Sequence, residues 1–217
     1  MPEVIISGPE GRIEAKYTPC ENPQAPLALI LHPEPNKGGT MNNKVIFSLY
    51  REFVKRNFAT MRFNFRGVGR SQGSYDDGEG ELADAATAMD WLQSQNPNAS
   101  YCWVAGFSFG AWIGMQLMMR RPEIKGFISL SAPTLTRDFS FLAPCPSSGL
   151  FIHGSENETV PIYSLSRVLE KISIQKGAVI EDKIISGADH FFNDHHEEMI
   201  NVVREYLDKV FIENSNN

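Results

Sequence analysis

The sequence has few cysteines and no long apolar run. Its 217 residues include three cysteines, without the spacing of a metal site. No apolar run approaches the ~20 residues that a membrane-spanning helix needs. The segment that begins at Met1 lacks the basic start and apolar core of a signal peptide. We therefore expect a cytoplasmic protein that does not contact a membrane.

An excess of basic charge is also missing. The net charge is −6 and the isoelectric point is near 5.4, which argues against nucleic acid or an anionic membrane surface as the main partner. A hydrophobic content of 42% and a charged content of 21% are ordinary for a globular protein. The length suits one α/β domain over residues 1–217.

Strand and helix patterns alternate along the chain. A turn-rich segment joins two predicted strands at 3–7 and 11–19. Further strands are expected at 27–31, 60–65, 127–130, 150–152 and 178–185, and helices at 43–57, 79–95, 162–172 and 196–211. The alternation predicts a mostly parallel sheet with helices on both faces. The short connection 133–146 leaves little room for a lid domain.

The stretch 101–114 carries the strongest motif. An apolar strand runs into Gly106-Phe107-Ser108-Phe109-Gly110, and a Gly/Ala-rich helix follows. This G-x-S-x-G pattern between strand and helix is typical of a nucleophile elbow. Its glycines remove side chains where strand and helix nearly collide, so that Ser108 can adopt a strained backbone conformation.

A serine hydroxyl needs a neighbouring base, and the chain has five histidines. His190 follows the last predicted strand, at the sheet edge where Ser108 also emerges. It is our candidate base, whereas His153, in a strand-end turn, is expected to be structural. A metal site built from His190, His195 and His196 would lack any ligand-spacing signature, so no metal is expected.

The third member of a triad is a carboxylate after the penultimate strand. The residue at that position is Asn157, a neutral amide. Glu156, Glu158 and Asp138 are alternative acids, with plain surface charge as the competing interpretation of the two glutamates. The acid is therefore left open among these four residues.

An oxyanion hole needs two N–H donors. Phe109, which follows the candidate nucleophile, supplies one. The second is expected from the loop after strand 27–31, where Pro33 and Pro35 have no N–H and Glu34 is the candidate. The Glu34 carboxylate must then point away, because it would repel an oxyanion.

Several of these motifs together resemble the α/β-hydrolase superfamily over nearly the whole chain. They are His32-Pro33 with 38–44, 64–71, Gly106–Gly110, His153-Gly154 with Val160-Pro161, and 188–192. The chain looks most like the small, lidless bacterial hydrolases of the dienelactone-hydrolase-like type. The resemblance implies an eight-stranded sheet and a Ser–acid–His triad in that chain order, with Asn157 at the family's acid position. It does not imply a substrate.

Two functions are carried forward. The first is a serine hydrolase of small carboxylic esters or thioesters, with Ser108 as nucleophile, His190 as base and no metal or organic cofactor. The second is a non-catalytic α/β-hydrolase-fold protein that binds a small ligand or a partner, a hypothesis motivated by Asn157. The sequence makes no prediction of oligomeric state.

Overall fold

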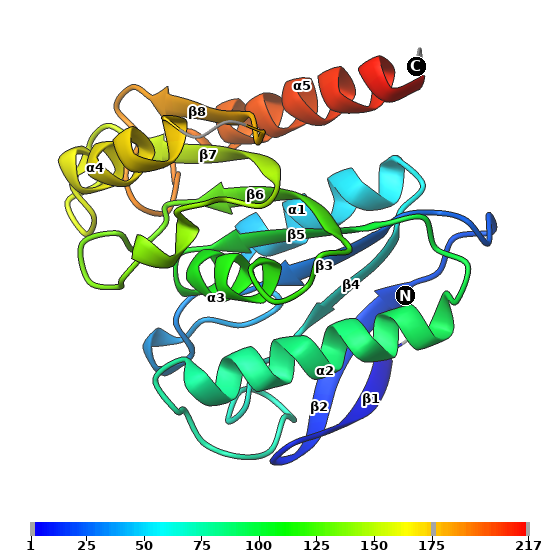
Figure 1. Ribbon diagram of the computed structural model, residues 1–217. Helices are drawn as coiled ribbons and strands as arrows, with labels where there is room; N and C mark the ends of the chain where they lie inside the picture. The colour runs from blue at the N-terminus through cyan, green and yellow to red at the C-terminus, as the bar shows by residue number, and fades with distance from the viewer. Residues whose placement is uncertain (1–2, 175–176, 216–217) are drawn as a thin grey trace.

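One eight-stranded sheet runs through the molecule. The computed structural model describes residues 3–174 and 177–215, and its strands lie in the order β1-β2-β4-β3-β5-β6-β7-β8 (Figure 1). The strands are β1 (Glu3–Gly8), β2 (Gly11–Thr18), β3 (Leu27–Leu31), β4 (Ala59–Phe63), β5 (Cys102–Phe107), β6 (Ile124–Leu130), β7 (Ser148–Gly154) and β8 (Ile180–Ile185). β2 pairs antiparallel with both β1 and β4, and the other pairs are parallel. The predicted mostly parallel sheet is confirmed.

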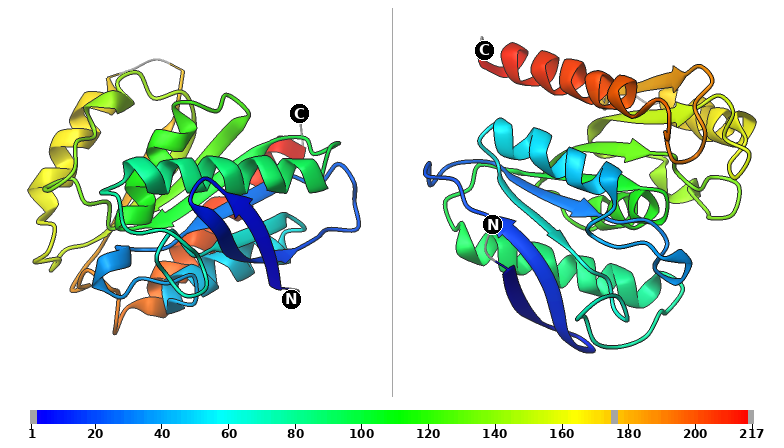
Figure 2. Two further views of the ribbon diagram at one scale, coloured as in Figure 1. Left: turned by 90° about the horizontal axis from the view of Figure 1, so that it is seen from below. Right: turned by 180° about the vertical axis from the view of Figure 1, so that it is seen from behind.

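Helices cover both faces of the sheet. They are α1 (Lys44–Lys55), α2 (Glu79–Gln95), α3 (Phe109–Met118), α4 (Ile162–Ser173) and α5 (His196–Ser215). Buried residues of α2, α3 and α4 share one apolar cluster, and those of α1 and α5 share another. Figure 1 shows α2 and α3 in front of the sheet, and the rear view of Figure 2 shows α1 and α5 on the opposite face.

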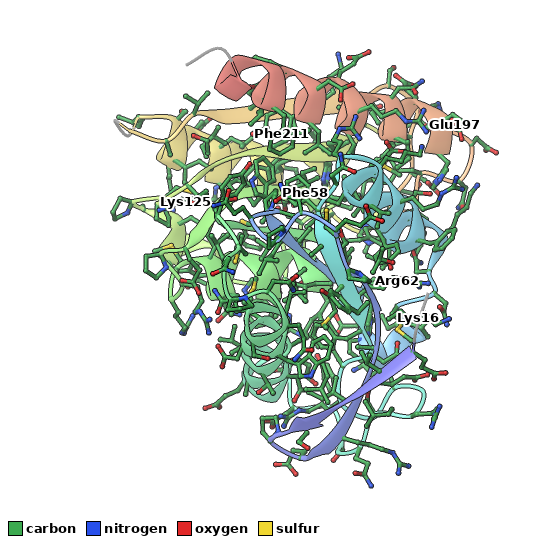
Figure 3. The ribbon with its side chains drawn as sticks, turned by 90° about the vertical axis from the view of Figure 1, so that its right-hand side faces the viewer. Lys16, Phe58, Arg62, Lys125, Glu197 and Phe211 are labelled. Atoms are coloured by element: carbon green, nitrogen blue, oxygen red, sulfur yellow. The ribbon has the colours of Figure 1, made fainter. Side chains whose placement is uncertain are left out.

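The central strands explain why helices are needed on both sides. All five residues of β3 are buried, as are all six of β5, so neither strand has a solvent face. The face beneath α5 is closed by aromatic contacts, and Figure 3 labels two of the rings, Phe58 and Phe211, which pack edge to face with centroids 5.2 Å apart.

Some element boundaries differ from the prediction. The strand expected at 60–65 ends at Phe63. The Asn64 N–H still donates to the Glu14 carbonyl of β2 at 2.9 Å, but the Asn64 side chain and the Phe65 N–H make contacts outside the sheet. The Asn64 side chain accepts the Met41 N–H at 2.8 Å, and the Phe65 N–H donates to His32 Nε2 at 3.0 Å. The helix expected at 43–57 ends at Lys55, followed by Asn57 in the left-handed region with φ 60°.

The remaining differences are small. β6 begins earlier than expected and β8 later, and α5 continues to Ser215. The connection from β6 to β7 contains only the 3₁₀ turn η2 (Ser140–Leu142), so the predicted lack of a lid is confirmed. A second 3₁₀ turn, η1 (Pro35–Lys37), follows β3. Over the described residues, no helix has the length and apolarity to cross a membrane.

Candidate active site

Ser108 occupies a strained turn between β5 and α3. Its backbone has φ 53° and ψ −119°, a region that non-glycine residues rarely adopt. A Cβ at Gly106 would lie 2.4 Å from the Gly110 carbonyl oxygen, and one at Gly110 would lie 2.2 Å from the Leu31 carbonyl oxygen. Only glycine therefore fits at either position, and the start of α3 can approach the end of β3. The Ser108 N–H also donates to the Leu130 carbonyl at 2.8 Å, which ties the turn to β6.

The loop after β8 brings His190 to this serine. Ser108 Oγ and His190 Nε2 are 3.1 Å apart. Two side chains hold the loop in place: Ser131 Oγ donates to the His190 carbonyl at 2.9 Å, and the Asp189 carboxylate accepts the Asn193 N–H at 3.0 Å. The sequence analysis missed the role of Ser131, which only the chain path beyond β6 reveals.

Asn157 lies on the other side of the imidazole. Its Oδ1 is 3.2 Å from His190 Nδ1 and accepts the Val160 N–H at 2.9 Å. Because the Val160 N–H needs an acceptor, the amide presents its oxygen to His190 and the proton sits on Nδ1. Nε2 is then free to accept the Ser108 proton. The geometry is that of a hydrogen-bonded Ser–His–Asn chain.

Neighbouring contacts keep Asn157 in this position. The Glu156 N–H donates to the Ala188 carbonyl at 3.0 Å, so the loops after β7 and β8 are fastened together. His153 Nε2 lies 2.7 Å from the Val160 carbonyl, to which it donates. Both His153 and Asn157 are buried, and His153 has the structural position expected for it.

The three alternative acids lie elsewhere. Glu156, Glu158 and Asp138 are exposed, and the Asp138 carboxylate accepts hydrogen bonds from the Ser140 N–H and Oγ at 2.8 and 2.7 Å. Within the described part of the chain, no ion pair involves His190. The structure therefore brings Asn157, and none of these three carboxylates, to the imidazole.

The surroundings favour a neutral His190. Burial, which is the largest cause, acts together with the nearby His153 and Lys37 to lower its pKa to about 4, against an opposing effect of Asp189. The Asp189 carboxylate itself accepts the backbone N–H groups of Phe191 and Asn193. His190 is thus ready to accept a proton at neutral pH but is a weak base.

The loop after β3 forms the other wall of the site. His32 is fully buried; its Nδ1 donates to the Pro33 carbonyl at 2.7 Å and its Nε2 accepts the Phe65 N–H at 3.0 Å. Burial lowers the pKa of His32 to about 4, which keeps the ring neutral. This ring fixes the peptide that links Pro33 to Glu34, the candidate second oxyanion donor. Phe109 is the first residue of α3, so its N–H has no acceptor within the helix.

The Glu34 carboxylate is occupied by neighbours. The Tyr75 hydroxyl donates to its Oε1 at 2.7 Å, and Arg137 Nη2 lies 3.8 Å from the same oxygen. Arg137 in turn binds the Asp77 carboxylate at 2.7 Å and lies over the Trp112 ring, 4.7 Å from its centroid. These contacts hold the acid side chain away from a developing oxyanion. The sequence contained no signal for this cluster, because Glu34, Arg137 and Trp112 are far apart in the chain and come from different elements.

Ser108 and His190 open into a cavity of about 380 Å³. Its walls include Glu34, Lys37, Val160 and Phe191. His196 contacts Ser48 Oγ through Nε2 at 2.9 Å and takes no part in the Ser–His–Asn chain. Among the residues that the structure describes, no group of His, Cys, Asp or Glu side chains is placed to hold a metal ion.

An eight-stranded, mostly parallel sheet with a strained serine after β5 and a histidine after β8 defines an α/β hydrolase. The chain belongs to the family described as serine aminopeptidase, S33, whose model matches residues 37–179. This match and the structural neighbours establish a hydrolase family and the α/β-hydrolase superfamily, and they do not single out a dienelactone-hydrolase-like type.

Three individual proteins resemble the chain closely. An uncharacterized protein of Rickettsia prowazekii is 48% identical over 211 residues, which are 95% of this chain and 89% of the relative. A crystal structure of a protein of unknown function from Agrobacterium tumefaciens has 53% identity and a TM-score of 0.96, covering 97% of this chain and 96% of that one. A serine hydrolase without a lid from Xanthomonas campestris has 27% identity and a TM-score of 0.84, with coverage of 96% and 94%.

Proposed function

We propose that the protein hydrolyses a small carboxylic ester or thioester through an acyl-enzyme on Ser108. The observation that carries this proposal is the 3.1 Å contact between Ser108 Oγ and His190 Nε2 at a strained elbow. In the first step the Ser108 oxygen attacks the carbonyl carbon while its proton moves to Nε2. His190 passes this proton to the leaving group as the bond from the carbonyl carbon to that group breaks. Water then attacks the acyl group, a water proton reaches Ser108 Oγ through His190, and the carboxylic acid is released.

The oxyanion hole in this proposal consists of two backbone donors. The N–H of Phe109 stands at the positive end of the α3 dipole. The N–H of Glu34 belongs to the peptide that the His32 ring orients through the Pro33 carbonyl. Asn157 holds the imidazole in the tautomer that the reaction needs. The site is open at a cavity without a lid, which favours small acyl groups.

The alternative is a non-catalytic protein that uses the same cavity to bind a ligand or a partner. The neutral Asn157 supports it, because an amide does not stabilise an imidazolium as a carboxylate does. The intact Ser–His contact and the conformation of Ser108 favour the enzyme, since a simple binding site does not need backbone strain at a serine.

A fluorophosphonate probe separates the two functions. The probe reacts with a serine only when a base removes its proton and an oxyanion hole accepts the charge. We expect covalent labelling of Ser108 in the folded protein, measured by intact-mass spectrometry, and none in Ser108→Ala. A folded wild-type protein that stays unlabelled would contradict the enzymatic function and favour the binding protein.

A further inference from the structure

The hydrogen-bond acceptor behind His190 carries no charge. Asn157 Oδ1 meets His190 Nδ1 at 3.2 Å and is shared with the Val160 N–H at 2.9 Å. Asn157 is 3% exposed, so solvent does not stabilise an imidazolium on this side of the ring. No ion pair in the described chain involves His190. The positive charge of Lys37 disfavours an imidazolium. Asp189, the preceding residue, favours the imidazolium only through space, since its carboxylate is hydrogen-bonded to Phe191 and Asn193. The imidazolium formed during catalysis therefore has no anionic group hydrogen-bonded to it.

This arrangement alters the proton transfers of the reaction. His190, whose pKa is lowered to about 4 chiefly by burial, withdraws the Ser108 proton weakly and returns it readily. Attack on the carbonyl must then be driven by the electrophilicity of the substrate rather than by the base. Acyl compounds whose leaving groups are electron-withdrawing are the more reactive ones.

The same proton also decides the fate of the tetrahedral intermediate. An alkoxide leaving group and the Ser108 oxygen are equally basic alcohols, and both compete for the proton on His190. Return of Ser108 therefore limits the forward reaction of an alkyl ester. Thiols and phenols ionise far more readily, with reference pKa values of about 8.5 and 10 for cysteine and tyrosine, and their anions leave without this proton.

We propose, on the basis of the function above, that the natural substrate is an acyl thioester or an ester of a phenol, and that alkyl esters and amides are poor substrates. The selectivity lies in the neutral Asn157–His190 contact. It does not depend on the shape of the acyl pocket.

The bonds and protons of this reaction balance with water as the only co-substrate. In acylation the bond from Ser108 Oγ to the carbonyl carbon forms, and the bond from that carbon to sulfur or phenolic oxygen breaks, its electron pair leaving on the departing atom. His190 Nε2 receives the Ser108 proton. It passes this proton to the anion after the bond to the carbonyl carbon has broken. In deacylation a water oxygen bonds to the carbonyl carbon, the bond to Oγ breaks, and the water proton reaches Oγ through His190. A carboxylic acid and a thiol or phenol are the products.

Deacylation is itself the hydrolysis of an alkyl ester, because the acyl group sits on a serine oxygen. The weak base slows this step as well, whichever leaving group has departed. Reactive substrates that carry the same acyl group should therefore release an initial burst of leaving group equal to the enzyme concentration. They should then share the same kcat. kcat/KM reports acylation and still varies with the leaving group.

The test is a series of acetyl compounds: p-nitrophenyl acetate, phenyl acetate, an alkyl thioacetate, ethyl acetate and acetamide. With the acyl group constant, only the leaving group changes. We expect kcat/KM for phenyl acetate to exceed that for ethyl acetate by more than about 100-fold, after subtraction of the rate of Ser108→Ala. The kcat/KM for the thioacetate should be similar to that for phenyl acetate. Acetamide should not be hydrolysed.

Asn157→Asp is the matched variant, because it changes only the charge of the contact. A carboxylate stabilises the imidazolium, so it should raise kcat/KM for ethyl acetate at least about tenfold more than that for phenyl acetate. Two results would overturn the selectivity alone. One is a wild-type kcat/KM for ethyl acetate within about tenfold of that for phenyl acetate. The other is an equal gain in kcat/KM for both esters in the variant. If the variant does not fold, the wild-type series decides by itself. Absence of Ser108-dependent hydrolysis of every compound would instead overturn the proposed function together with the selectivity.

Discussion

Asn157 is the residue at which this site departs most from a Ser–His–carboxylate triad. Replacing it with Asp introduces the charge without changing the shape of the side chain, and its oxygens can still accept from His190 and Val160. We expect Asn157→Asp to raise kcat on p-nitrophenyl acetate by at least roughly tenfold, or about 1.4 kcal/mol of barrier. In a serine protease that serves as a general reference, the reverse change lowers kcat by about 10⁴.

The controls for this prediction are the exposed carboxylates. Glu156→Gln, Glu158→Gln and Asp138→Asn should each leave kcat nearly unchanged, because none of these side chains hydrogen-bonds to His190 in the structure. If one of them abolishes activity while Asn157→Asp changes nothing, the acid is that carboxylate and the assignment of Asn157 is wrong.

The same pair of proteins should differ in pH dependence. His190 must be neutral to accept the Ser108 proton, and burial lowers its pKa to about 4, with His153 and Lys37 acting in the same direction and Asp189 against. Activity of the wild type should therefore persist as the pH falls and be lost only near pH 4. A carboxylate at position 157 raises the pKa of His190, so the acid limb of kcat/KM should move to higher pH in Asn157→Asp by about one unit or more. Identical acid limbs would show that the charge at position 157 does not reach the imidazole.

At the scale of elements, the loop after β3 depends on side chains from two other loops. The hydroxyl of Tyr75, which precedes α2, donates to Glu34 Oε1 at 2.7 Å. Arg137 Nη2, from the β6–β7 connection, lies 3.8 Å from the same oxygen. Tyr75→Phe keeps the ring that packs 5.9 Å from Phe109 but releases the carboxylate into the cavity that it lines. We expect kcat/KM to fall by about tenfold, through repulsion of the oxyanion.

A double variant checks this explanation. Glu34→Gln removes the charge, so Tyr75→Phe with Glu34→Gln should recover most of the lost kcat/KM. If the double variant is as slow as Tyr75→Phe alone, the hydroxyl acts on something other than the Glu34 charge.

At the scale of the whole molecule, we expect different aromatic residues to determine the free energy of unfolding and kcat/KM. Phe53 of α1 is fully buried. Its ring centroid lies 5.1 Å from that of Phe58 and 6.1 Å from that of Trp103. Phe53→Ala should lower the free energy of unfolding by about 3–5 kcal/mol, and so Tm by roughly 10 °C for a chain of this size. kcat/KM at 25 °C should change little, because Phe53 does not line the cavity.

Phe191 is the matched control. Its ring is 52% exposed, lines the cavity and packs edge to face with His190 at 5.0 Å. Phe191→Ala should leave Tm almost unchanged and lower kcat/KM, chiefly through KM. Scanning calorimetry measures Tm, and ester kinetics measure kcat/KM, for Phe53→Ala and Phe191→Ala. An equal fall of Tm in the two variants would contradict the prediction.

Local patterns in the sequence were enough to predict a mostly parallel sheet with helices on both faces and the sharp turn at Ser108. The number of strands and the order of the triad were implied by the resemblance to α/β hydrolases. Continuous apolar runs such as Leu27–Leu31 indicate strands buried on both faces, and two glycines around Ser108 indicate the sharp turn. These features depend on residues close together in the sequence. The end of the strand at Phe63 was missed, because the Phe65 N–H donates to His32, which is distant in the chain.

Only the tertiary structure decided which side chains meet. The sequence left Asn157, Glu156, Glu158 and Asp138 as possible partners of His190, because a loop without regular structure does not indicate which side chain turns inward. The hydrogen bond from Glu156 N–H to Ala188 and that from Val160 N–H to Asn157 turn the amide towards the imidazole. The direction of the Glu34 carboxylate was likewise settled by Tyr75 and Arg137, which reach it from loops far away in the chain. Side-chain direction in such loops is set by long-range hydrogen bonds and charges, and no local pattern encodes these.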